Sequence, residues 1–506
     1  MSAHQLAEAR ELLRTARYDA AIACLRESDG WASPLHEQAL LLRAEVLLQR
    51  DPIDALEALA RSSDLLATSQ PFGYYLLSGR AYANARNFET ATEMFGLAKS
   101  AAGENAVALA EIAHQRARLR FMQGQFDPED PDLEAALTHP KPGHRMLTLV
   151  VRSWMFAGMG NYRAQVADLR RAIDLARGFP NDVELYTTAR ALHSLVRVSA
   201  ELADQDAADD AQALFESLEW PHEIADEEFL CMRALAWDAF LRGDSARSQW
   251  LLRDSKELAP SDAWRVMSHV DRAYVARMNR NEPWARDEIL QAQVYARGVV
   301  WAATTGEERQ ALVTLAVLFA PLDMGQAQRY VSTYMRLGTE NMDPQNAVRN
   351  DRRTAGFTAY ATGRVQQVLG NTQSATAAFE NAYRIFDEAE HHFRAALAAQ
   401  GLAEITDAAV WIERARQHAG FFPKSAFYRF LTDRVTREAA PWIEGLTPMQ
   451  RQLALSLCEG LEYKELSRRF SRSEFTIKRE VQALYDMFNV RTRSALRELL
   501  EERGAL

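Results

Sequence analysis

Polar and basic side chains recur at helical spacing near the C-terminal end of the sequence. Five of them fall on one side of a helix predicted to begin after residue 473: Thr476, Lys478, Arg479, Gln482 and Tyr485. Lysine, arginine and glutamine are the side chains that hydrogen-bond to base edges in the major groove of DNA, which admits one α-helix. The other side of the same helix is apolar at i, i+4, i+7 and i+11, with Ile477, Val481, Leu484 and Phe488. The spacing predicts a helix that packs through one face and offers the other to a nucleic acid.

The surrounding residues predict the helices that would position this one. Thr447 is expected to cap a preceding helix that starts at Pro448 and ends at Gly460. Ser473 is expected to cap the polar helix itself. Apolar partner positions in the two preceding helices are Leu453, Leu457, Leu466 and Phe470. Together they predict a small core of three or four helices.

The residues from 446 to 506 resemble the LuxR-type (GerE-like) helix-turn-helix domain of bacterial transcription regulators. The resemblance rests on four short motifs in the expected order: LTP at 446–448, KELS at 464–467, TIK at 476–478 and VRTR at 490–493. The DNA-binding residues that it implies are Lys464, Ser473, Thr476, Lys478, Arg479, Gln482 and Arg491. In this family the last helix often forms a dimer contact on double-stranded DNA. A homodimer contact is therefore implied at Ala495, Leu499 and Glu502.

Four residues depart from the family pattern, and two of them, Gln450 and Gln452, replace its usual glutamates. Glu480 stands where the family usually has histidine, and its carboxylate either accepts from a cytosine amino group or repels phosphate. Met487 stands where a lysine usually contacts the DNA backbone. These departures keep a second interpretation open, in which the tail no longer reads DNA and the chain is a scaffold or anti-regulator.

The charge distribution separates the tail from the rest of the chain. Residues 446–506 contain 11 basic and 9 acidic side chains. The whole chain contains 59 and 69, so residues 1–445 contain 48 and 60, a net charge of −12. A basic surface attracts a polyanion, and an acidic one does not bind DNA by itself.

The long N-terminal region has apolar residues at helical spacing throughout and predicts an all-α fold. Two segments resemble the two-helix tetratricopeptide repeat in the spacing of small and aromatic residues. The first contains Gly79, Tyr82, Phe88, Ala91, Phe95 and Ala98, and the second Gly363, Gly370, Ala375, Phe379 and Ala382. Such repeats stack into a solenoid that binds peptides or proteins. We therefore predict a tetratricopeptide-like helical solenoid followed by a small helix-turn-helix domain, with a peptide or protein as its partner.

Proline density predicts where the array is interrupted. The stretch 127–145 holds Pro128, Pro131, Pro140 and Pro142, and helices do not run through so many prolines. The predicted organisation is repeats over 1–126, an interruption over 127–145, repeats over 146–432, a linker over 433–445 and the DNA-binding domain over 446–506.

Several motifs are absent from the sequence. Regulators of the MalT-like family, which join such repeats to a LuxR-type tail, usually begin with a nucleotide-binding domain. None of the six lysines follows a glycine, so the phosphate-binding loop of that domain is missing. The sequence also predicts no enzyme activity, no cofactor and no metal site. Three widely spaced cysteines and the lack of a long apolar run predict a cytoplasmic protein with no membrane partner.

Overall fold

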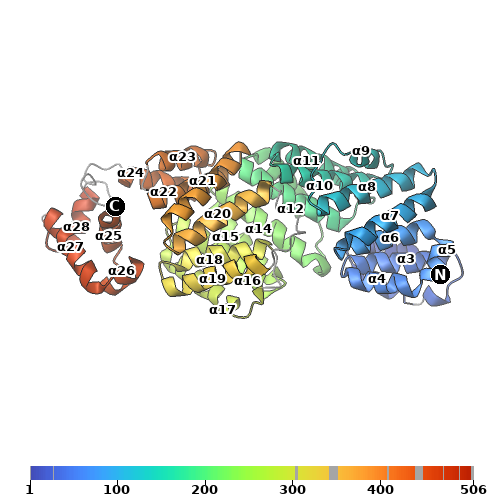
Figure 1. Cartoon of the computed structure of the whole chain (residues 1–506), viewed down its shortest axis with the longest axis horizontal. Helices are drawn as coiled ribbons and strands as arrows, with labels where there is room; N and C mark the ends of the chain where they lie inside the picture. The colour runs from blue at the N-terminus through green and yellow to red at the C-terminus, as the bar shows by residue number, and fades with distance from the viewer. Residues whose placement is uncertain are drawn as a thin grey trace. The chain divides into compact units, whose positions relative to one another are not determined.

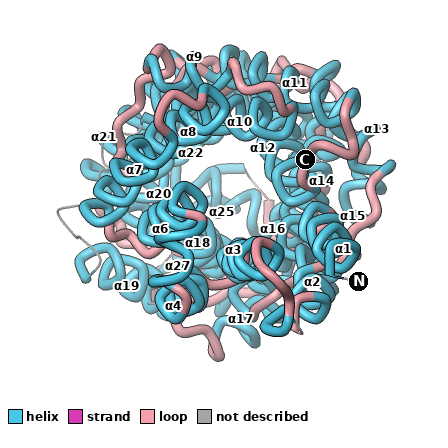
Figure 2. The backbone as a smooth tube through the Cα atoms, turned by 90° about the vertical axis from the view of Figure 1, so that its right-hand side faces the viewer, coloured by secondary structure: helices cyan, strands magenta, loops and turns pink. Residues whose placement is uncertain are grey.

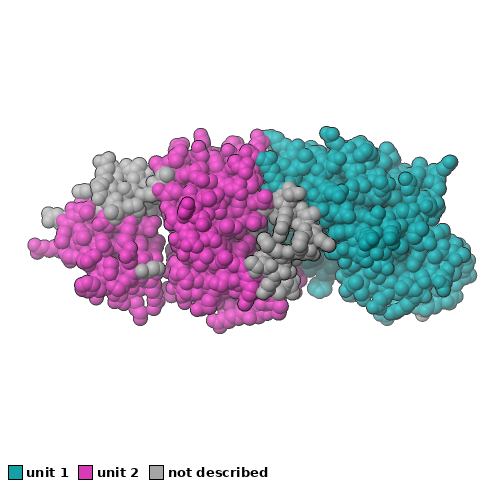
Figure 3. Space-filling view, viewed as in Figure 1, with its two compact units in different colours: residues 1–200, 204–234, 343–354 teal, residues 201–203, 235–342, 355–506 magenta. Residues whose placement is uncertain are grey.

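The computed structural model describes residues 2–26, 28–301, 306–340, 352–406, 409–438, 448–470, 472–488 and 490–502. Within these ranges the chain is helical and contains no strand (Figure 2). The predicted all-α, tetratricopeptide-like fold is confirmed. The chain forms two compact units (Figure 3). Unit 1 comprises residues 1–200, 204–234 and 343–354, and unit 2 comprises 201–203, 235–342 and 355–506.

The helices of unit 1 are labelled in chain order in Figure 1. They are α1 (Ser2–Arg14), α2 (Tyr18–Cys24), η1 (Ser28–Gly30), α3 (Leu35–Leu48), α4 (Pro52–Arg61), α5 (Ser63–Ser69), α6 (Pro71–Asn84), α7 (Phe88–Ala102), α8 (Ala106–Met122), α9 (Pro131–Leu137), α10 (Pro142–Met159), α11 (Tyr162–Gly178), α12 (Leu185–Leu202), α13 (Gln205–Ser217) and η2 (His222–Ile224). The next helix, α14 (Ala225–Arg242), contributes residues to both units.

The remaining helices belong to unit 2, apart from residues 352–354 at the start of α20, which belong to unit 1. They are α15 (Ser245–Leu258), α16 (Asp262–Met278), α17 (Glu282–Ala296), α18 (Gly306–Phe319), α19 (Met324–Glu340), α20 (Arg352–Val368), α21 (Thr372–Glu388), α22 (His392–Thr406), α23 (Ala409–Ala419), α24 (Ala426–Glu438), α25 (Pro448–Cys458), α26 (Tyr463–Arg469), α27 (Glu474–Phe488) and α28 (Arg493–Glu502). Residues 201–202 at the end of α12 also belong to unit 2. No helix in the described part of the chain is long and apolar enough to cross a membrane.

One kind of turn joins the two helices of most pairs. A residue with positive φ is followed by Asn or Asp, which begins the second helix. The turns of this kind are Arg86–Asn87, Gly160–Asn161, Ala203–Asp204, Gly243–Asp244, Arg280–Asn281 and Gly370–Asn371. In five of them the Asn or Asp side chain accepts a backbone N–H three residues later, as Asp244 does from Arg247 at 2.9 Å. Each of these bonds satisfies an N–H that a helix start otherwise leaves without a partner.

These turns recur at regular intervals. The residues with positive φ at 160, 203, 243 and 280 are 43, 40 and 37 residues apart. The intervals exceed the tetratricopeptide period of about 34 residues. The helices of this stretch are correspondingly long, and three of them have 18 residues.

The two segments identified by their small and aromatic residues are helix pairs. In α6 and α7, Phe95 is 2 % exposed and packs against Gly79. In α20 and α21, Phe379 is fully buried between Gly363 and Gly401, the latter on α22. Glycine at these positions allows the helices to approach an aromatic ring closely, as the spacing predicts.

The proline-rich stretch is more regular than its composition suggests. It contains the short helix α9, and α9 packs against both α8 and α10. Pro131 and Pro142 each stand at the first position of a helix, where the missing N–H costs nothing. Unit 1 continues through the stretch on both sides. The prolines therefore start helices here.

Candidate nucleic-acid interface

Helices α25 to α28 enclose their own apolar core. Its buried residues are Leu453, Ala454, Leu457, Cys458, Leu466, Ile477, Val481, Leu484, Tyr485, Leu496 and Leu500. Phe470 and Phe488 are partly buried against them. The apolar face predicted for α27 is therefore the packed face. The predicted cap Thr447 lies outside the described residues.

The start of α27 is fixed by the residue that precedes it. The Ser473 hydroxyl oxygen accepts the Thr476 N–H at 3.1 Å, so Ser473 caps the helix. The Thr476 hydroxyl lies 2.9 Å from the same oxygen and is thereby held close to the cap. The first turn of α27 is ordered by these two contacts before any ligand is bound.

The turn between α25 and α26 sets the position of α26. Gly460 has a φ of +91°, a conformation that favours glycine, and α25 ends two residues earlier. The Glu462 N–H donates to the Glu465 carboxylate at 2.9 Å, which closes the first turn of α26. The Arg493 guanidinium donates to the Leu461 carbonyl at 2.6 Å and ties the start of α28 to this turn.

The face of α27 away from the core is polar and exposed. It carries Lys478, Arg479 and Gln482, all exposed. The Lys478 ammonium lies 5.6 Å from the centroid of the Tyr463 ring, and Gln482 donates to Asp486 at 2.8 Å. These contacts hold the side chains near the helix without burying their polar ends.

The structure adds one residue to this face. Phe475, one turn before Lys478 and Arg479, is 78 % exposed. An exposed phenyl ring on a surface of this kind is suited to contact the methyl group of thymine. Its place three residues before Lys478 was visible in the sequence, but a lone phenylalanine in an amphipathic pattern reads first as a core residue.

Tyr485 was wrongly assigned to the polar face. It is 9 % exposed and belongs to the core, because it follows Val481 by four residues and so lies on the same side. Burial raises the pKa of its hydroxyl. The other predicted positions differ in exposure: Lys464 and Arg491 are exposed, and Thr476 is half-buried.

Two of the departures from the family pattern, Glu480 and Met487, lie on α27. Glu480 is half-buried, and Met487 is 52 % exposed near the end of the helix. The carboxylate follows Arg479 directly and therefore reduces the positive potential beside the exposed face. The interface is consequently a mixed surface with two adjacent cations and a nearby acid.

The last helix offers a narrow apolar edge. Leu496 and Leu500 are fully buried in the core. The predicted dimer residues Ala495 and Leu499 are half-buried on the adjacent edge, and the Glu502 side chain lies outside what the structure describes. The edge is small, with one aliphatic side chain of appreciable size.

The sequence matches no protein-family model, and a search of curated proteins finds no relative. Among solved structures, the crystal structure of the APC/C hetero-tetramer Cut9–Hcn1 is similar in 98 % of this chain and 90 % of that chain. The sequence identity is 14 % and the TM-score is 0.36. The description of this chain as a helical-repeat protein therefore rests on its own helix pairs and turns.

Proposed function

We propose that this chain is a helical-repeat protein that binds a peptide or protein partner and docks on double-stranded DNA through helices α25–α28. The observation that carries the DNA part is the exposed face of α27. Its polar residues point away from a closed core, and Ser473 fixes the first turn of the helix. A preformed helix with exposed lysine, arginine and glutamine is what the major groove accepts.

The partner-binding part of the proposal is supported by the repeats. Helix pairs that stack through small and aromatic residues present extended surfaces, which proteins of this architecture use to bind other proteins. The net charge of −12 over residues 1–445 makes these surfaces unsuited to nucleic acid. Cross-linking of the full-length protein in cell extract, with mass spectrometry of the linked peptides, tests this part. Partner links on repeat helices support it, and links confined to 448–502 contradict it.

The DNA part is tested by selecting bound sequences from a pool of random duplexes. The full-length protein is compared with Lys478→Ala, Arg479→Ala and the control Lys99→Ala, which removes an exposed lysine from α7. The proposal is supported if a short motif is enriched, if Lys478→Ala and Arg479→Ala reduce this enrichment, and if Lys99→Ala does not. Each lost phosphate contact should also reduce the dependence of log K on log salt by about 0.9. Enrichment of no motif by the unsubstituted protein contradicts it.

Glu480 favours a second candidate function, a protein-binding scaffold whose tail does not read DNA. A carboxylate beside the exposed face of α27 opposes phosphate, and the chain as a whole is acidic by 10 charges. The two candidates differ in one measurable way. A scaffold binds its protein partner equally well when Lys478 and Arg479 are both replaced and retains no affinity for duplex DNA at low salt.

A homodimer on DNA belongs to the first candidate. Two half-sites read by a symmetric pair of α27 helices would give more specificity than one short helix. The edge formed by Ala495 and Leu499 is the proposed contact. Light scattering of the protein on its selected duplex measures the mass directly. One chain of 57.1 kDa per duplex contradicts the dimer, and two chains support it.

A further inference from the structure

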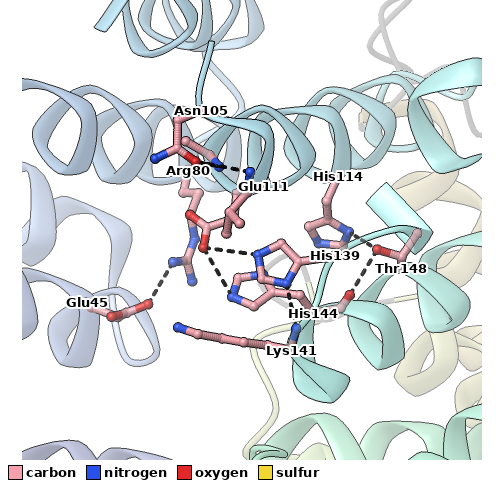
Figure 4. Close-up of polar contacts among 11 residues, drawn as sticks. Glu45, Arg80, Asn105, Glu111, His114, His139, Lys141, His144 and Thr148 are labelled. Atoms are coloured by element: carbon pink, nitrogen blue, oxygen red, sulfur yellow. Dashed lines mark hydrogen bonds and ion pairs between the residues drawn. The ribbon is translucent and has the colours of Figure 1, made fainter. Parts of the chain in front are cut away.

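Three metal-ligating side chains meet in unit 1, away from the α27 surface. Glu111 lies on α8, His139 in the turn between α9 and α10, and His144 in the first turn of α10 (Figure 4). Both histidines direct Nε2 at the same carboxylate oxygen. The Glu111 Oε1 atom is 3.6 Å from His139 Nε2 and 3.4 Å from His144 Nε2. The two imidazole rings stack with their centroids 4.1 Å apart.

The local fold holds these residues in place. Pro142 starts α10, which puts His144 in its first turn. The Thr148 hydroxyl donates to the His144 carbonyl at 2.9 Å and lies 3.1 Å from His114 Nδ1, which therefore donates to it. His114 is one turn from Glu111 on α8, so this chain of hydrogen bonds joins α8 to the start of α10 (Figure 4).

The contacts among Glu111, His139 and His144 are too long to be hydrogen bonds. The His139 side chain is 1 % exposed, and its Nε2 has no hydrogen-bond partner among the described residues. Both nitrogen–oxygen distances exceed the usual range of about 2.7–3.2 Å. A buried polar atom left without a partner costs about 1–3 kcal/mol, so its persistence points to a missing ligand.

The three groups are buried or half-buried, and basic side chains lie near them. Burial lowers the pKa of His139 and lowers the pKa of His144 to about 3. Burial raises the pKa of Glu111, which shows that its negative charge is poorly solvated. The nearby Arg80 guanidinium is held by Glu45 at 2.8 Å, and Lys141 is exposed to solvent.

The distances fit a tetrahedral transition-metal ion such as zinc. Zinc binds histidine nitrogen and carboxylate oxygen at about 2.0–2.2 Å in a tetrahedron, which separates neighbouring ligand atoms by about 3.4 Å. The two separations here are 3.4 and 3.6 Å. Two imidazoles and one carboxylate suit zinc and similar transition ions, whereas magnesium and calcium prefer sites built from oxygen alone.

We propose that Glu111, His139 and His144 form a binding site for a zinc-type divalent cation. Water fills the fourth position on the side of His144, whose side chain is 31 % exposed. The cation fastens α8 to the turn between α9 and α10, within the proline-rich stretch. This site is independent of the proposed DNA-binding function, and the sequence predicted no metal.

Binding has a consequence for one backbone hydrogen bond. His139 Nδ1 accepts the Lys141 N–H at 3.1 Å, so the proton of the neutral ring is on Nε2. A cation on Nε2 requires this proton to move to Nδ1. The Lys141 N–H then loses its acceptor, and its amide should exchange with deuterium faster in the metal-bound protein. Most backbone amides near a bound ligand exchange more slowly. Faster exchange at Lys141 would therefore be specific to coordination through His139.

The test begins with full-length protein freed of metal by a chelator. Zinc is titrated in competition with a chromogenic chelator, and Co²⁺ is used to observe the visible absorption of a tetrahedral centre. We expect one tightly bound equivalent. His144→Ala and Glu111→Gln should each weaken binding by more than about 100-fold, the upper end of what loss of an outer-shell partner costs. His144 is partly exposed and Gln is isosteric with Glu, so both variants should fold, which metal-free thermal melts verify.

The control is His392→Ala, because His392 and His418 form another histidine pair with Nδ1 atoms 3.4 Å apart. Retention of the zinc equivalent in this variant and its loss in His144→Ala support the proposal. No tight equivalent in the unsubstituted protein overturns it, as does equal affinity in His144→Ala. An unchanged exchange rate of the Lys141 amide on zinc binding overturns coordination through His139.

Discussion

Gly363 lies directly against the ring of Phe379, and a Cβ at Gly363 would be 2.6 Å from the Phe379 Cδ1 atom. The ring is fully buried, with Gly401 on its other side. The contact joins α20 to α21 and fixes how closely the two helices approach. Gly79 and Phe95 form the same contact in unit 1.

Replacing Gly363 with alanine should therefore destabilise unit 2. A methyl group has no space there, and overpacking of a closed core costs about 1–3 kcal/mol. Calorimetric unfolding of the full-length protein measures the effect as a lower melting temperature. Gly96→Ala is the matched control, because Gly96 is exposed on α7 with open space around it. The control should raise helix stability by up to about 1 kcal/mol. Equal effects at the two sites would contradict the packing argument.

At Arg86, in the turn between α6 and α7, replacement by glycine should stabilise the fold. The φ of Arg86 is +64°, a conformation that costs a side chain about 1–2 kcal/mol and glycine almost nothing. Arg86→Gly should raise the melting temperature of unit 1, although glycine usually destabilises. Arg86→Ala separates backbone from side-chain effects and should give no such gain. A lower melting temperature for Arg86→Gly would show that the positive φ is not the controlling feature.

Glu288 is a buried carboxylate with three donors in the α16–α17 pair. His269 Nδ1 donates at 2.6 Å, Arg272 at 2.6 Å and the Trp284 indole at 2.9 Å. Glu288→Gln removes the charge and leaves the half-buried Arg272 without its buried counter-ion, at a cost of about 3 kcal/mol. The exposed pair of Glu413 with Arg416 provides the control, and Glu413→Gln should change the melting temperature little. Similar losses for the two variants would contradict the role of burial.

The contribution of Glu288 should depend on pH. Burial raises its pKa, but the His269 hydrogen bond and the Arg272 charge outweigh burial, and the net pKa is lowered. A carboxylate with a lowered pKa stabilises the fold above its unfolded-state pKa, near about 4.3. This stability is lost as the pH falls through the folded-state pKa. Melts of the unsubstituted protein and Glu288→Gln should therefore converge in acid and remain apart at pH 7.

Glu480 gives a prediction for the DNA interface. If α27 faces the major groove, Glu480→Gln removes a repulsion from phosphate while keeping the shape of the side chain. Duplex affinity should rise by about 3- to 10-fold at low salt, and the gain should shrink as salt screens the charge. Glu459→Gln, an exposed acid at the end of α25, provides the comparison. A loss of affinity in Glu480→Gln would instead indicate that this carboxylate accepts from cytosine.

Sequence patterns predicted the helix pairs well where small and aromatic residues alternate at fixed spacing. Gly79 and Phe95 lie in the two helices of one pair, 16 residues apart, and so do Gly363 and Phe379. Because each contact is local, it can be recognised from the spacing of the residues in the sequence. The apolar face of α27 was predicted for the same reason. Tyr485 was misplaced because a tyrosine has both an apolar ring and a polar end, and spacing alone does not say which is used.

The Glu111–His139–His144 cluster could not be predicted in this way. Its ligands come from α8, from the turn after α9 and from the first turn of α10, with the two histidines 28 and 33 residues after Glu111. The available signal was a pair of histidines five residues apart in a proline-rich stretch. The packing of α8, α9 and α10 against one another brings Glu111 to them.

The turns between paired helices bear on how helix pairs can be gained or lost during evolution. Each turn has its own residue of positive φ, and five of the six also have a cap bond that spans three residues, as at Asp244 and Arg247. No distant partner is needed to form it. A whole pair of helices could therefore be inserted or deleted between two such turns while the neighbouring pairs keep their local geometry. Sequence identity between the pairs is not required for this, since arginine, alanine and glycine all occupy the same position of the turn.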